Sequence, residues 1–104
     1  MILLKEHARE VHELPASLQQ ALFSELMAAA RAVQDAFSPW KLNYSCFGNA
    51  DPHVHWHIHP RYESDPDHRN HPWLHSADFS AHRGSDAERS RVIAQIRAAL
   101  AYQR

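Results

Sequence analysis

This chain of 104 residues has a single cysteine, no long apolar run and no excess of either positive or negative charge. The single cysteine, Cys46, cannot form an internal disulfide, which favours a reducing cytoplasm, and we expect it to be a small buried residue rather than a nucleophile. No apolar run is long enough for a signal peptide or a membrane-spanning helix. Eleven Lys and Arg nearly balance twelve Asp and Glu, so the chain lacks a basic field for nucleic acid and a polybasic run for a membrane. We therefore expect a cytoplasmic protein that binds neither.

Glycine is also scarce, with two residues, whereas histidine is abundant, with ten. Eight of the ten histidines lie between residues 53 and 82. Because histidine titrates near neutral pH, this region is where we expect chemistry. Gly48 falls in a predicted turn, where a backbone conformation forbidden to larger residues, or the close approach of a phosphate, would require glycine.

The segment HVHWHIHP at residues 53–60 carries histidine at every second position. In a β-strand alternate side chains point to one face, so the imidazoles of this segment form a row. Neighbours in such a row are spaced by roughly 6.5–7 Å, which suits contacts around one phosphate better than ligation of one metal ion. The spacing favours chemistry on an anion. Two alternatives remain open: a histidine-rich strand without a catalytic role, and a fortuitous metal-binding site.

Hydrophobic periodicity predicts the other elements in outline. Residues 2–4 form a short apolar run typical of a strand, and from Pro15 a stripe at helical spacing indicates an amphipathic helix of about twenty residues that ends at Ser38-Pro39. Its expected core residues share the apolar stripe: Leu18, Leu22, Phe23, Leu26, Met27, Ala29, Ala30, Val33 and Phe37.

The second half of the chain predicts two strands, a loop and a helix. Residues 41–47 and 52–59 are rich in aromatic and β-branched residues and flank a turn, which indicates an antiparallel pair. Residues 61–84 lack a period and predict a long irregular loop, held to the domain by Trp73, Leu74 and Phe79. Ser85 and Glu88 fit a capping box that opens a helix over 85–104. We expect one α+β domain over residues 1–104.

Several motifs together resemble the histidine-triad (HIT) family of nucleotide hydrolases and transferases, in its bacterial branch. The string HVHWHIHPRY at 53–62 is similar to the family signature, KLNY at 41–44 and FGNADP at 47–52 to the strand and turn before it, and LKEH at 4–7 to the end of an earlier strand. The resemblance covers residues 1–73. His59 departs from it, since an apolar residue is usual there, and the chain starts where family members already have a helix and strands.

The resemblance implies a HIT-like antiparallel sheet with one long helix and a C-terminal helix. It also implies cleavage at the α-phosphate of a nucleoside phosphoramidate or dinucleoside polyphosphate through a nucleotidyl-histidine, without cofactor or metal, in a homodimer. His55 would be the nucleophile, His57 would contact the phosphate on the leaving-group side, and His53 would orient His55. His7, Asn43 and Asn49 would bind the substrate. Trp56 and Ile58 should face the core.

Alternatives remain at this point. The chain could be a non-catalytic nucleotide-binding module, or a zinc-binding protein in which loop histidines join two strand histidines.

His59 lies on the same face of the strand as the other histidines, because it continues their alternation, and we expect it to emerge into solvent rather than extend the site. We expect solvated side chains for the loop histidines, His68, His71, His75 and His82. The short N-terminus implies an open base pocket that discriminates between bases by less than roughly tenfold.

Overall fold

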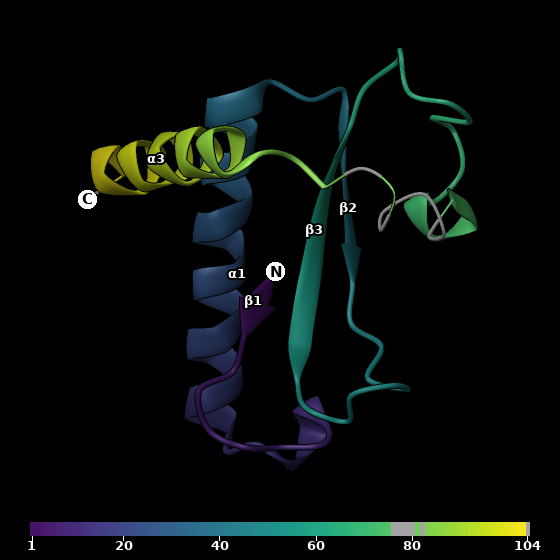
Figure 1. Cartoon of the computed structure of the whole chain (residues 1–104). Helices are drawn as coiled ribbons and strands as arrows, with labels where there is room; N and C mark the ends of the chain where they lie inside the picture. Colours follow the sequence, from purple (N-terminus) through teal and green to yellow (C-terminus); the bar gives the residue numbers. More distant parts are fainter. Residues whose placement is uncertain (76–80, 82, 104) are drawn as a thin grey trace.

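The computed structural model, which describes residues 1–75, 81 and 83–103, has an α+β fold built on a three-stranded antiparallel sheet (Figure 1). Its strands are β1 (Ile2–Leu3), β2 (Lys41–Ser45) and β3 (His55–Arg61), in the spatial order β1-β3-β2. The histidine segment therefore supplies the central strand, which is held by hydrogen bonds on both edges. This position fixes the direction of its side chains.

Helix α1 (Ala16–Phe37) packs along one face of this sheet (Figure 1). It ends where predicted, because Ser38 adopts a left-handed conformation with φ 47° and Pro39 follows. The predicted stripe is correct at its centre, but Phe23 is 61% exposed, so its assignment to the core is wrong. A buried alanine, Ala32, lies outside the stripe; small residues of this kind give little signal in an apolar pattern. The buried residues of α1 are Leu22, Leu26, Ala30 and Ala32.

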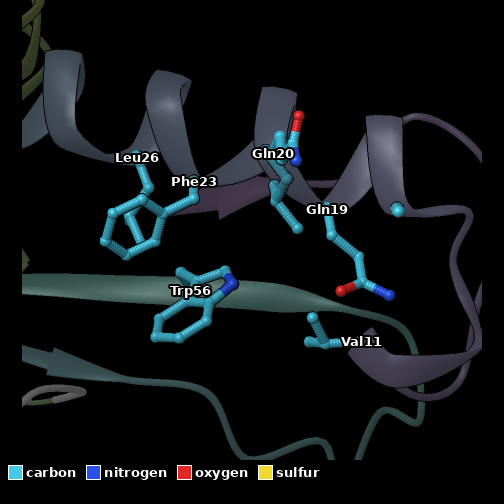
Figure 2. A pocket seen from close by; sticks show the side chains of 8 residues that line it. Val11, Gln19, Gln20, Phe23, Leu26 and Trp56 are labelled. Carbon is cyan, nitrogen blue, oxygen red and sulfur yellow. The ribbon is translucent and has the colours of Figure 1, made fainter.

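The strand register separates β3 into two faces, as the alternation predicted. Trp56 pairs with Ile2 and Ile58 pairs with Tyr44, and Trp56 lines a cavity together with residues of α1 (Figure 2). The intervening histidines pair with Leu3, Ser45 and Asn43 and lie on the opposite face. One face of the sheet therefore serves packing and the other presents imidazoles.

The central strand begins at His55, later than the predicted position 52. Before it, Val54 is buried in a cluster with Leu4, Leu14 and Leu22, and its amide donates to the carbonyl of Ala8 at 2.9 Å. His53 thus lies just outside the strand, in a segment held by the N-terminal region. That region contains one short 3-10 helix, η1 (Val11–Glu13).

The expected loop over 61–84 is partly structured. Arg61 is the last residue of β3 and is 6% exposed, and a 3-10 helix, η2, spans Pro72–His75. Leu74 is exposed and does not hold this segment to the domain. Phe79 and His82 lie outside the described residues.

Helix α3 (Asp86–Tyr102) crosses the C-terminal half of α1 (Figure 1). Its start is the predicted capping box, in which the Ser85 hydroxyl accepts from the Glu88 amide at 3.2 Å and the Glu88 carboxylate accepts from the Ser85 amide at 2.8 Å. None of its described residues is fully buried, and Val92 and Ile93 are exposed. Within the described part of the chain, no helix combines the length and apolar character needed to span a bilayer.

Candidate functional site

Three histidines of β3 form a continuous row on the face away from α1. The ring centroids of His55 and His57 are 5.2 Å apart with the planes at 78°, and those of His57 and His59 are 5.6 Å apart and nearly parallel. The rings are closer than the roughly 6.5–7 Å expected from backbone spacing, because they lean toward one another. His59 is half-buried in this row, so the expectation that it emerges into solvent is wrong.

The backbone fixes the orientation of His55. Its Nδ1 lies 2.6 Å from the carbonyl oxygen of His53. A carbonyl oxygen only accepts, so Nδ1 carries the hydrogen, and in the neutral ring the lone pair is on Nε2. Since neutral imidazole is nucleophilic near pH 7, His55 has the tautomer that a nucleophile at Nε2 requires.

His53 and His7 form a second pair at the start of the row. His53 Nε2 donates to the carbonyl oxygen of Leu4 at 2.7 Å, and its ring stacks on His7 with centroids 5.2 Å apart. His53 Nδ1 is buried and accepts no hydrogen bond from any described residue. The structure thus places His7 against His53 and ties His53 to the end of β1.

The two predicted asparagines lie in different settings. Asn43 pairs with His59 across β2 and β3, and its Oδ1 is buried without a hydrogen-bond partner among the described residues. Asn49 is exposed in the turn between these strands, and within the described part of the chain it makes no hydrogen bond to the histidines. Gly48 has φ +91°, which confirms the prediction of a conformation that favours glycine.

Trp73 contacts the row, and the sequence did not predict this contact. Its indole from η2 lies nearly perpendicular to the rings of His57 and His59, at centroid distances of 5.0 and 5.1 Å. The indole Nε1 donates to the hydroxyl of Ser45 at 3.1 Å, and Ser45 pairs with His57. An aromatic residue in a polar loop indicated that the loop packs against the domain. Nothing in the sequence indicated that Trp73 packs against the histidines.

A cavity of about 470 Å³ opens beside the start of β3. Its lining includes His53 and His55, together with Glu10, Cys46 and Phe47. A second cavity, of about 370 Å³, lies on the α1 face beside Trp56 and Phe23 (Figure 2). Of these two cavities, the first is lined by histidines of this segment and the second is not, so the first is the candidate site for a small molecule.

Burial and neighbouring charge disfavour the protonated forms of His57 and His59. Burial, and then the proximity of His55, lowers the pKa of His57 below its ordinary value. Burial followed by His57 lowers the pKa of His59, and Arg61 lowers it further. Burial also raises the pKa of Cys46, but this residue is only half-buried and lines the first cavity, so the expectation of a buried side chain is wrong.

Arg61 organises the segment that follows the row. Its Nη2 donates to the carbonyl oxygens of Pro66 and Asp67 at 3.2 and 3.3 Å, and its Nε lies 3.5 Å from an oxygen of Asp65. These contacts hold the turn that leads toward η2. Across residues 1–75, 81 and 83–103, no three His, Cys, Asp or Glu residues are grouped so that they could hold a metal ion.

Several solved structures share this fold. A histidine triad protein from Marinobacter aquaeolei VT8 is 25% identical, with a TM-score of 0.74 over 95% of this chain and 69% of that protein. One from Bradyrhizobium japonicum is 22% identical, with a TM-score of 0.78 over 95% of this chain and 72% of its own, and shows the fold alone. A third, from Sinorhizobium meliloti 1021, is 27% identical, with a TM-score of 0.72 over 86% and 64% of the two chains.

The family comparison agrees with the geometry. No match is found among curated proteins. The HIT domain model matches residues 1–64, which include the whole histidine row and the N-terminal segment that carries His7. On this match, and on the arrangement of His53, His55 and His57, the chain belongs to the HIT domain family.

Proposed function

We propose that the protein is a hydrolase or nucleotidyl transferase that cleaves at the α-phosphate of a nucleoside phosphoramidate or phosphoanhydride. The observation that carries this proposal is the hydrogen bond from His55 Nδ1 to the His53 carbonyl, which leaves Nε2 with the lone pair. Membership of the HIT domain family supports a nucleotide as the substrate. His7, Asn43 and Asn49 are proposed to contact it.

In the first step Nε2 of His55 attacks the α-phosphorus, a P–N bond forms, and the bond to the leaving group breaks. His57, the next ring in the row, is proposed to give the leaving group its proton. As the His55 ring gains positive charge, its Nδ1–H bond to the His53 carbonyl strengthens. The products are nucleotidyl-His55 and the free amine or phosphate.

In the second step a water oxygen attacks the same phosphorus. The P–Nε2 bond breaks, its electron pair returns to His55, and the water proton goes back to His57. The lowered pKa of His57 makes its imidazolium a stronger acid, while burial limits the protonated fraction at neutral pH. With a second acceptor in place of water, the same steps give nucleotidyl transfer.

Turnover of adenosine 5′-phosphoramidate in excess chelator tests this proposal. Wild type should hydrolyse it, His55→Ala should lose roughly a thousandfold or more in kcat/KM, and the exposed His71→Ala should stay within about twofold. Retention of most activity by His55→Ala would contradict the mechanism. Binding without turnover would favour the non-catalytic module, and loss on chelation with recovery on adding zinc would favour a zinc enzyme.

A homodimer in the cytoplasm is also part of the proposal. Exposed apolar residues such as Leu3, Val92 and Ile93 give the small domain surface that a second copy could cover. Cys46 is free, as in proteins of a reducing compartment. Light scattering coupled to size-exclusion chromatography should give twice the 12.0 kDa mass of the chain.

A further inference from the structure

Two aromatic side chains from different segments meet at the histidine row. Phe47, which follows β2, contacts Trp73 of η2 with ring centroids 5.8 Å apart and planes at 73°. Phe47 is 65% exposed, although it lies in the family-matched region beside the candidate site. We call this pair the aromatic wall.

The aromatic wall presents hydrocarbon rather than polar atoms to a ligand. The indole nitrogen of Trp73 already donates to the Ser45 hydroxyl, and Phe47 has no polar side-chain atom. An exposed aromatic ring backed by a second ring at a steep angle is suited to contact with another flat ring. The occupant of this place should therefore be planar and apolar.

The aromatic wall runs from the proposed nucleophile to the far end of the row. Phe47 lines the 470 Å³ cavity together with His53 and His55, while Trp73 contacts His57 and His59. In phosphoryl transfer the attacking and leaving atoms are roughly in line through phosphorus. A leaving group displaced by His55 therefore lies on the opposite side of the phosphorus, and His57, the proposed proton donor, and Trp73 beside it are the groups that it would meet if it leaves along the row.

Charge argues against a long polyphosphate at this end. Arg61 lies on the same face as the row, but it is buried and its guanidinium donates to the Pro66 and Asp67 carbonyls. Burial lowers the pKa values of both His57 and His59. Among the described residues, the groups beside Trp73 therefore provide little positive charge to compensate several phosphates.

We propose that Phe47, backed by Trp73, selects the leaving group, and that the preferred substrate is a nucleoside phosphoramidate whose amine carries an aromatic ring. This inference rests on the proposed function, because it assigns the leaving-group side of the same site. It predicts a preference over both small alkyl amines and dinucleoside polyphosphates.

The test compares affinities in a His55→Ala background, where the ligands stay intact. The ligands are adenosine phosphoramidates of 2-phenylethylamine and of propylamine, which share the nucleoside and the phosphate, and diadenosine tetraphosphate. Isothermal titration should show the phenylethyl compound binding about tenfold more tightly than the other two. Adding Phe47→Leu, which keeps an apolar side chain, should reduce the preference over propylamine to about twofold or less.

Phe23 provides the matched control, because it is 61% exposed but lies on α1, across the sheet from the histidines. Phe23→Leu should leave the tenfold ratio unchanged. Equal affinities, no measurable binding, tighter binding of the tetraphosphate, or a ratio insensitive to Phe47→Leu would overturn the inference. Turnover by wild type is a separate readout: a Phe47-dependent ratio without turnover would support this inference and contradict the proposed hydrolase.

Discussion

His55 Nδ1 lies 2.6 Å from the backbone carbonyl oxygen of His53, two residues earlier in the chain. Because the acceptor is a main-chain atom, the tautomer of His55 depends on the path of the backbone and not on a second side chain. The His53 side chain has another partner, the Leu4 carbonyl. One residue thus contributes to the site twice: its backbone orients the proposed nucleophile, and its ring ties the start of β3 to β1.

These two contributions can be separated by mutation. His53→Ala removes the ring but keeps the carbonyl that orients His55, so turnover should fall at least tenfold less than in His55→Ala. Loss of the bond to Leu4 should lower the free energy of unfolding by about 1–2 kcal/mol, measured by urea titration. His71→Ala, at an exposed position, should change it by less than about 0.5 kcal/mol. If His53→Ala were as inactive as His55→Ala while fully folded, the ring itself would be essential.

The two glycines offer a matched pair for the turn before the triad. Gly48 has φ +91°, where an alanine is strained, so Gly48→Ala should destabilise the protein by about 1–3 kcal/mol. At Gly84 an added Cβ would meet the side chain of Glu88, with its Oε2 at 3.0 Å, so that side chain would shift and only its exposed capping bond from the Ser85 amide would be weakened. Gly84→Ala should therefore cost clearly less in the same urea titration. Equal costs would mean that the conformation of Gly48 is not required.

Stability should fall as the pH is lowered through the ordinary histidine range. The pKa values of His57 and His59 are lowered in the folded protein, chiefly by burial, and the nearby His55, Arg61 and N-terminal amino group all oppose protonation. At a pH between the folded and unfolded pKa values, these two histidines bind more protons in the unfolded chain than in the folded protein. Their contribution to the free energy of unfolding is therefore fully present above about pH 6.5 and decreases as the pH falls below that value.

Urea titrations at pH 7.5, 6.5 and 5.5 measure this dependence. The double variant His57→Gln, His59→Gln should lose less stability over this range than wild type. His12→Gln combined with His71→Gln, two exposed positions, should follow wild type. An unchanged slope in the first double variant would show that these two rings do not titrate differently on folding.

The sequence predicted those parts of the fold in which local pattern determines structure. Alternation placed His55, His57 and Trp56 on their correct faces, and Ser85 with Glu88 marked the start of α3. The position of Trp73 could not be predicted, because an aperiodic segment gives no indication of the surface on which it packs. The burial of Arg61 could not be predicted from the sequence either. Its hydrogen-bond acceptors are backbone carbonyl oxygens, which every residue has, so no residue type marks them.

The central claim is that His55 becomes covalently nucleotidylated, and trapping the intermediate tests it most directly. A histidine phosphoramidate is labile in acid, so turnover of an adenosine phosphoramidate should be quenched in alkali and the peptides analysed by mass spectrometry. The account predicts an adenylyl group on the peptide containing His55 in wild type and its absence in His55→Ala. An adenylyl group on another residue, or turnover by His55→Ala at a rate close to that of wild type, would contradict it.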